Sequence, residues 1–189
     1  MRKLVTTLFL SLIFTTTWAQ NAPIESLFNR FKTAKSFKVE FSSEGENYTL
    51  ISQGKLFNLT SNPVDVIFDG TDLYTFNKKS NEMLIERLSG YSILTNPINL
   101  FTLNLKDFNI TKDKEIYILT PKLGTHLGID RAEITMQNGS TIKSMDIVPS
   151  GMYPITFTLK TITYDITPSP NIFKFNKSSY PKVEIIDLR

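Results

Sequence analysis

The stretch Ser36-Phe37-Lys38-Val39-Glu40-Phe41 decides the fold class, because apolar and charged side chains alternate along it with a period of two. This alternation is typical of a half-buried β-strand. It predicts that Phe37, Val39 and Phe41 face an apolar interior, while Lys38 and Glu40 face water. The chain around this strand is therefore expected to form a sheet with one buried face.

The residues before this strand have a different period. Apolar side chains recur at helical spacing from Ile24 to Ala34, and Asn21 and Pro23 are suitable residues to begin a helix. The spacing predicts a helix over Ile24–Ala34 whose apolar stripe packs on the sheet.

The first nineteen residues have the pattern of a cleaved secretory signal peptide. Arg2 and Lys3 precede a mostly apolar run over residues 4–14, and Thr17 and Ala19 are small residues suited to a cleavage site. The run is too short for a membrane-spanning helix, which needs about 20 residues. An uncleaved anchor is the alternative. Cleavage after Ala19 leaves residues 20–189 as a single domain, with 19 basic against 18 acidic residues, because two of the 21 basic residues are removed.

The residues after Phe41 continue as short apolar or alternating runs separated by polar turns. Asp69-Gly70 and Asn138-Gly139 are the strongest hairpin signals. The expected strands are Tyr48–Ile51, Lys55–Leu59, Val64–Phe68, Leu73–Phe76, Met83–Leu88, Phe108–Thr111, Ile116–Thr120, Ala132–Gln137, Thr141–Val148, Ile155–Ile166, Phe173–Phe175 and Val183–Ile186.

One proline-led stretch interrupts this series and predicts a second, short helix over Pro97–Leu105. Short strands joined by turns favour one antiparallel sheet over a parallel α/β fold. We therefore expect a mainly β protein with a few helices (α+β). Its core would be one antiparallel sheet of about 10–11 strands, strongly curved or barrel-like.

Composition argues against several classes of function. The chain has no cysteine, so it has no disulfides or thiol chemistry, and zinc or iron–sulfur sites lack their main ligand. His126 is the only histidine, and no Gly-x-Ser-x-Gly motif accompanies it. No basic stripe indicates nucleic-acid binding. We expect no catalytic residues and no enzyme activity, no metal, no cofactor and no nucleic acid partner.

Aromatic residues are abundant, with fourteen Phe and seven Tyr. Two helices cannot cover the whole inner face of one curved sheet, which leaves an apolar hollow suited to a lipid. Each methylene buried there would gain about 0.8 kcal/mol. The alternative is a barrel whose Phe side chains simply fill the core, and composition leaves both possibilities open.

Several segments, in order, resemble the LolA family of periplasmic lipoprotein carriers. The similar segments are Arg30–Phe41, Gln53–Phe57, the hairpin Asp69–Asn77 (DGTDLYTFN), the proline-led Asn96–Phe101, Asp107–Lys122 with Tyr-Ile-Leu-Thr-Pro-Lys at its end, Phe173–Phe175 and Tyr180–Asp187. The order and spacing of these segments, rather than any one motif, carry the resemblance.

The resemblance implies an incomplete, strongly curved antiparallel β-barrel with a helical lid over an apolar cavity. It also implies a monomer that works in the periplasm. Its cargo would be the acyl chains of lipoproteins, or another lipid. An inner-membrane lipoprotein-releasing transporter would be the donor, and an outer-membrane protein the acceptor. Well-known members carry an Arg that binds the lid, but this chain has no Arg between Arg30 and Arg87. We assign that role to no residue here.

The expected ligand and lid residues follow from strand alternation, helical spacing and this resemblance. The expected lipid-binding residues are Phe37, Val39, Phe41, Leu56, Tyr74, Phe76, Met83, Ile85, Phe101, Ile118 and Phe157. The expected lid residues are Leu27, Phe28, Phe31, Ile98, Phe101 and Leu105. Thr75, Thr102 and Ser144 are expected near the cavity wall, where they would weaken retention of the cargo.

Two alternatives to lipoprotein transport remain open. One is a LolA-like carrier of another lipid or a lipid-linked precursor. The other is a structural envelope protein that binds no ligand because its core is filled.

Overall fold

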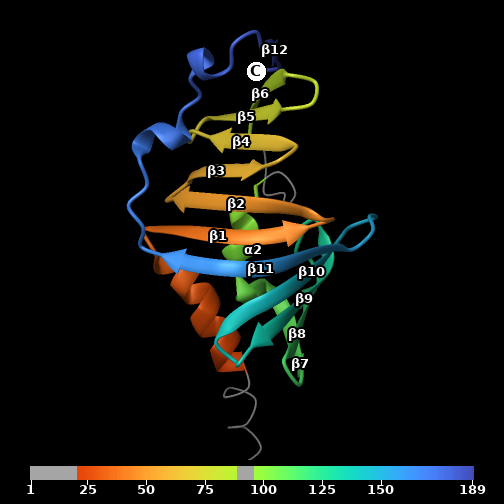
Figure 1. The fold of residues 1–189 in the computed structure, drawn as a ribbon. Coiled ribbons are helices and arrows are strands. Elements are labelled where there is room, and N and C mark those ends of the chain that lie inside the picture. The colour runs from red at the N-terminus through yellow and green to blue at the C-terminus, as the bar shows by residue number, and fades with distance from the viewer. Residues whose placement is uncertain (1–20, 89–95) are drawn as a thin grey trace, which may run out of the picture.

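The computed structural model, which describes residues 21–88 and 96–189, contains one twelve-stranded sheet that curls without closing (Figure 1). Its strand order is β12-β6-β5-β4-β3-β2-β1-β11-β10-β9-β8-β7. The expected incomplete barrel is confirmed, with slightly more strands than predicted. The expected signal peptide lies outside the described residues.

The strands form two antiparallel meanders and one added edge strand. The first meander contains β1 (Ser36–Ser43), β2 (Glu46–Gln53), β3 (Leu56–Ser61), β4 (Val64–Phe68), β5 (Asp72–Asn77) and β6 (Glu82–Arg87). The second contains β7 (Phe108–Asp113), β8 (Ile116–Pro121), β9 (Ile129–Gln137), β10 (Thr141–Pro149) and β11 (Ile155–Tyr164). Strand β12 (Glu184–Asp187) pairs with β6 in parallel, so the sheet is not wholly antiparallel as predicted.

Strand β1 joins the two meanders, because it pairs with β2 on one side and with β11 on the other. Its inward side chains Phe37, Val39 and Phe41 are all buried, as the alternation predicts. The pairing with β11 shifts register between Glu40 and Phe41. Such a bulge bends a strand and increases its twist, and here it helps the sheet to curl.

The two hairpin signals read from the sequence form turns where they were expected. Asn138 and Gly139 have φ angles of 52° and 65°, the left-handed pair that a type I′ turn requires. In the other turn, the Asp69 carboxylate accepts hydrogen bonds from the amides of Thr71 and Asp72, both at 2.9 Å. Gly70 in that turn has a φ of +100°, a backbone conformation that residues with a side chain rarely adopt.

The N-terminal helix covers residues 21–33, close to the predicted range. The second predicted helix is much shorter than expected. It consists of α2 (Ile98–Phe101), and a separate 3-10 turn follows at Leu105–Asp107. A cluster of rings holds both helices to the sheet, because the Phe31 centroid lies 5.1 Å from Phe37, 5.2 Å from Phe101 and 5.0 Å from Tyr164.

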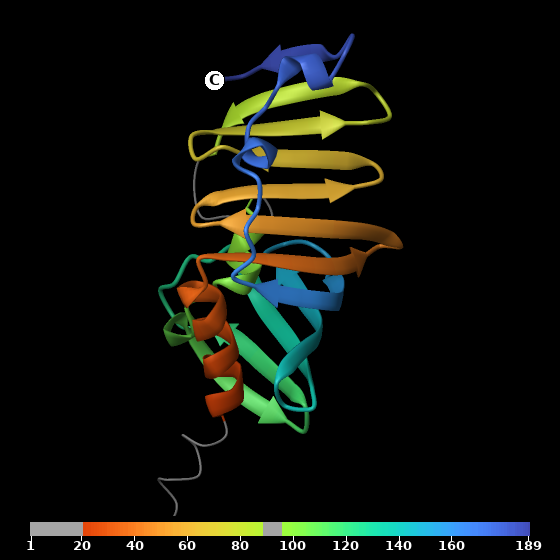
Figure 2. The ribbon, with the colours of Figure 1, turned by 60° about the vertical axis from the view of Figure 1, so that its left-hand side comes forward.

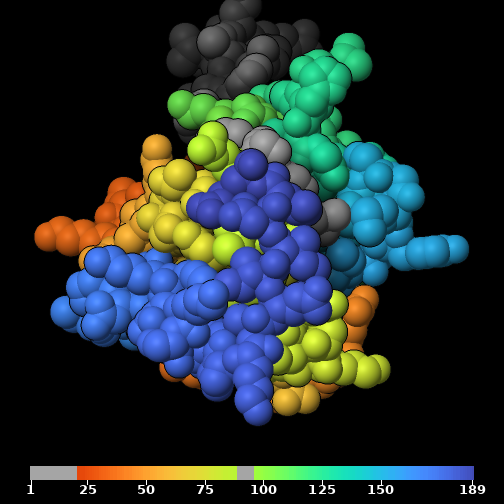
Figure 3. Space-filling model, turned by 90° about the horizontal axis from the view of Figure 1, so that it is seen from above, coloured from red at the N-terminus to blue at the C-terminus, as the bar shows by residue number. Residues whose placement is uncertain are grey.

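The outer face of β3–β6 is covered by a strap, residues 165–183, which runs from β11 to β12 (Figure 2). Seen from above, the dark blue C-terminal residues lie against the yellow strands β4–β6 (Figure 3). The predicted strand Phe173–Phe175 is wrong, because Pro170–Phe173 forms a 3-10 turn within this strap. Pro170 fixes its own φ and has no amide hydrogen, which favours a turn over a strand.

Aromatic rings and hydrogen bonds attach the strap to the sheet. Phe175 stacks on Tyr74 with centroids 5.0 Å apart, and Tyr180 meets Phe76 at 4.8 Å. The Asn58 side-chain amide donates a hydrogen bond of 2.7 Å to the carbonyl of Ile172. The strap therefore encloses a second apolar core on the face of the sheet opposite the main one.

Replacing Asn58 by alanine is expected to lower the free energy of unfolding by about 1–2 kcal/mol, because it leaves the Ile172 carbonyl without its donor in a partly buried place. Urea titration measures the loss, and hydrogen exchange should show faster opening of the strap. Asn109→Ala, at an exposed position in β7, is the matched control and should change stability little. Equal losses in both variants would contradict the role of the strap bond.

Arg189 fastens β12 to the sheet edge. Its guanidinium donates to Asp187 and, at 2.6 Å, to the buried side chain of Asp72 in β5. The side-chain hydrogen bonds from Arg189 are the main reason why the pKa of Asp187 is lowered to about 2. A lowered pKa stabilises the folded state above the unfolded pKa near 4, and this contribution is lost as the pH falls towards 2.

Arg189→Ala is therefore expected to return the pKa of Asp187 towards its ordinary value of 3.8. An NMR titration of the Asp187 carboxyl measures this directly. Arg131→Ala removes another exposed cation, which pairs with Glu133, and should leave the Asp187 titration unchanged. An unmoved Asp187 pKa in the Arg189 variant would show that the contact does not persist in solution.

Candidate functional site

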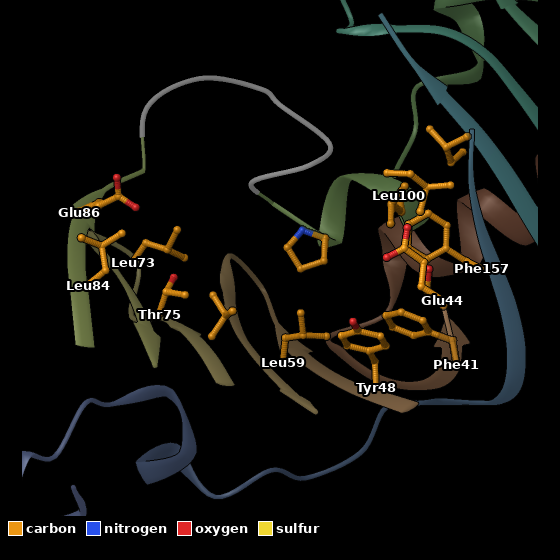
Figure 4. Close-up of a pocket in the computed structure, with 15 residues that line it drawn as sticks. Phe41, Glu44, Tyr48, Leu59, Leu73, Thr75, Leu84, Glu86, Leu100 and Phe157 are labelled. Carbon is orange, nitrogen blue, oxygen red and sulfur yellow. The ribbon is translucent and has the colours of Figure 1, made fainter. Parts of the chain in front are cut away.

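A cavity of about 490 Å³ lies between the inner face of the curled sheet and α2 (Figure 4). This volume is within the range of 300–1,000 Å³ usual for ligand sites. The lining side chains come from both meanders and from the α2 segment. They are Phe41, Ser43, Glu44, Tyr48, Leu59, Val66, Leu73, Thr75, Leu84, Glu86, Pro97, Leu100, Ile147, Ile155 and Phe157.

The strand register explains the apolar floor of the cavity. Leu59 pairs with Val66, Val66 with Thr75, and Thr75 with Leu84, so one row of side chains crosses β3–β6 on the same face. Phe41 stacks on Tyr48 at 5.2 Å and meets Phe157 edge-on at 5.8 Å. These three rings form the wall nearest β11.

Few polar groups interrupt this lining. Thr75 lies in the cavity floor, as predicted. Thr102 and Ser144 are not among the described residues that line the cavity. The Thr102 hydroxyl donates to the Ile98 carbonyl, and Ser144 alternates with the buried Met145. Burial is the main cause of the raised pKa of Tyr48, and the carboxylates of Glu46 and Glu44 raise it further. The polar side chains of the lining are the hydroxyls of Ser43, Tyr48 and Thr75 and the carboxylates of Glu44 and Glu86, and the rest of the lining is apolar.

The structure divides the expected lipid-binding residues into three groups. Phe41 and Phe157 line the cavity. Phe37, Val39 and Phe101 are buried in the main core beside it. The remaining six are directed to the other face of the sheet: Leu56, Tyr74, Phe76, Met83, Ile85 and Ile118.

The expected inward direction of β5 and β6 side chains is wrong by one residue. Tyr74 pairs with Ile85 and Phe76 with Met83, and both pairs lie under the strap, while Leu73 and Thr75 line the cavity. A shift of one residue exchanges the faces of a strand. Both faces of these strands are covered by apolar groups, so their sequence lacks the alternation that would have fixed the direction.

The same alternation places Leu56 and Ile118 on the outer face. Their neighbours Phe57, Tyr117 and Leu119 are buried in the main core, and successive side chains point to opposite faces.

The expected lid residues lie together in the main core. Leu27, Phe28, Phe31, Ile98 and Phe101 are buried there, and Leu105 packs against the cluster. Among the described residues of the two helical segments, Leu100 and Pro97 line the cavity itself. The α2 turn thus contacts the cavity on one side and the aromatic cluster on the other.

Sequence reasoning missed most of the cavity residues, including Tyr48, Leu59, Leu84 and Leu100. The pairing of Tyr48 with Phe41 could have been inferred from a two-residue Glu44-Gly45 hairpin, which sets the register of β1 against β2. Leu100 carries no such signal, because a helix of four residues is too short to show periodicity.

Within residues 21–88 and 96–189, no cluster of three or more His, Asp or Glu side chains could hold a metal ion. In the same part of the chain, no helix has the length and apolar character needed to cross a membrane.

The fold and the cavity together define a half-open β-barrel with an internal apolar site, an architecture suited to hydrophobic ligands. The model of a family described as "Outer membrane lipoprotein carrier protein LolA" matches residues 28–176. The chain belongs to this family of carriers. A comparison with curated protein sequences found no significant match.

One solved structure shares the fold at low sequence identity, and a second shows a weaker similarity. An uncharacterized conserved protein from Thermus thermophilus has a TM-score of 0.53 and 6% identity, over 89% of this chain and 99% of that one. A DUF1329 family protein from Desulfovibrio piger has a TM-score of 0.44 and 15% identity, over 81% and 94% of the two chains. At these identities, the first similarity supports the fold alone.

Proposed function

We propose that this protein is a periplasmic carrier that binds the acyl chains of lipoproteins in the cavity described above. It receives them from an inner-membrane releasing transporter and delivers them to an outer-membrane acceptor. The observation that carries this proposal is the apolar cavity on the inner face of the sheet, in a chain that belongs to the LolA family. In this proposal, residues 1–19 are a cleaved signal peptide, and residues 20–189 act as a monomeric single domain.

The cavity favours binding because each methylene removed from water gains about 0.8 kcal/mol. A carrier must also release its cargo, so retention has to be moderate. The Thr75 hydroxyl in the floor and the open side of the barrel both limit how much apolar contact the cargo makes. In our proposal the acceptor binds the cargo more tightly and so gives the transfer its direction.

The α2 turn is the part that we propose moves when cargo enters. It places Leu100 against the cavity and Phe101 against Phe31, so a small rotation would exchange one apolar contact for the other. Residues 21–33 would serve as the base against which it moves.

A carrier of another lipid is the second candidate. The chain lacks any Arg between Arg30 and Arg87, where known lipoprotein carriers have one that binds the lid. A lipid that does not need this control would suit the same cavity.

The test uses an environment-sensitive apolar dye bound to the mature protein and displaced by an acylated lipopeptide. Displacement, together with lipopeptide transfer to acceptor vesicles, is the expected result. Mass spectrometry of lipid copurified with the gently isolated protein identifies the natural cargo. Binding of a different lipid but not lipopeptide would favour the second candidate, and binding of neither would overturn both.

A further inference from the structure

Two carboxylates stand at opposite ends of the cavity. Glu44 belongs to the turn between β1 and β2, close to Phe41 and Phe157, and Glu86 lies on β6 beside Leu84 (Figure 4). Among the described residues that line the cavity there is no Lys, Arg or His. The charged part of this lining is therefore negative at both ends.

Neither Glu44 nor Glu86 forms an ion pair within residues 21–88 and 96–189, in contrast to other acidic side chains of the sheet. Glu40 pairs with Lys38 at 2.6 Å, and Asp65 pairs with Lys78 at 2.8 Å. The sequence of residues 89–95, which follows β6, contains no basic residue. The negative charges of Glu44 and Glu86 are therefore free to attract or repel a ligand that enters the cavity.

The position of Glu44 is not explained by the turn it occupies. Glu44 and Gly45 have φ angles of 51° and 83°, and asparagine is the residue that favours the first place of such a turn. The equivalent place in the β9–β10 hairpin is Asn138. Glu44→Asn consequently removes the charge without weakening the hairpin, which makes it a suitable test variant.

We infer that the cavity selects amphiphiles that carry a cationic group, namely an ammonium, near the end of the acyl chain. It disfavours anionic lipids. This inference rests on the proposed function and names the class of its ligand. A hollow with apolar walls and charge of one sign concentrates ligands of the opposite sign. Because Glu44 is exposed and Glu86 only half-buried, the preference should be moderate and should weaken with salt.

The experiment compares three probes with the same dodecyl chain: dodecylammonium, dodecanol and dodecanoate. Each displaces the apolar dye from the mature protein at neutral pH and low ionic strength. We expect dodecylammonium to bind about tenfold more tightly than dodecanoate, with dodecanol between them. In the double variant Glu44→Asn/Glu86→Gln the three affinities should converge.

The control variant Glu115→Gln/Glu184→Gln loses the same charge at two exposed positions that do not line the cavity. It should keep the preference of the wild type. Two further probes, an acylated peptide with lysine beside the acyl group and an aminolipid, separate the two sources of such an ammonium. The probe that is transferred to acceptor vesicles identifies the source.

The outcomes separate this inference from the proposed function. Equal binding of all three dodecyl probes by the wild type would overturn the charge preference and leave the carrier function standing. A preference that persists in the double variant, or disappears equally in the control, would also overturn it. Failure of all probes, including dodecanol, would overturn both proposals.

Discussion

Replacing Leu59 by tryptophan is expected to lower acyl-chain affinity at least tenfold, the largest effect that we expect on binding. Leu59 lies in the cavity floor, where it is paired with Val66 of β4 and lies beside Tyr48 (Figure 4), so an indole ring there would occupy the space available to the chain. Affinity falls because each methylene of the acyl chain that can no longer be buried loses about 0.8 kcal/mol of binding free energy. Dye displacement by a lipopeptide measures the affinity.

Thr60→Trp is the matched control for this prediction. Thr60 is the next residue of β3, it is exposed, and it points away from the cavity. It should bind lipopeptide like the wild type. Circular dichroism should show that both variants keep the β fold. Unchanged binding in a folded Leu59 variant would mean that the ligand lies elsewhere.

Phe31→Ala is expected to lower the free energy of unfolding by about 3–5 kcal/mol, the largest effect that we expect on stability. Phe31 is only 2% exposed, and its ring contacts Phe37 of β1, Phe101 of α2 and Tyr164 of β11. The truncation would leave a hollow at the point where the N-terminal helix, α2 and both meanders meet. Urea unfolding of the protein measures the change.

Two further variants keep this prediction testable if Phe31→Ala does not fold. Phe31→Leu keeps most of the apolar volume and should cost less than the alanine variant. Lys32→Ala, at the exposed neighbouring position, should stay within about 0.5 kcal/mol of the wild type. A Phe31→Leu loss no larger than that of Lys32→Ala would contradict the central role of the ring cluster.

Local signals predicted much of the strand framework. Val64–Phe68 matches β4 at both ends, and Asp69-Gly70 and Asn138-Gly139 form turns where their dipeptides indicate them. These features depend on neighbours in sequence, through turn geometry and alternation. The buried triplet Phe37, Val39 and Phe41 was predicted for the same reason, because charged residues separate its members.

Other features depended on segments far apart in the sequence. Nothing near Phe173 indicates that it will cover the outer face of β3, more than a hundred residues earlier, through the bond from Asn58 to Ile172. That cover makes Tyr74, Phe76, Met83 and Ile85 an outer apolar face, which local sequence could not distinguish from an inner one. The cavity floor was misassigned for this reason.

The sequence by itself determined the mainly β class, the hairpin turns at Asp69-Gly70 and Asn138-Gly139, and the family resemblance, because each depends on the order and spacing of residues along the chain. Only the tertiary structure decided which face of β5 and β6 meets the cavity, how short α2 is, and that Glu44 and Glu86 flank one site. The physical reason is that burial of both faces of a strand removes the alternation of apolar and polar residues, and this alternation is what shows which side chains point inward. A side chain's partners across a curled sheet are then set by register and by the strap.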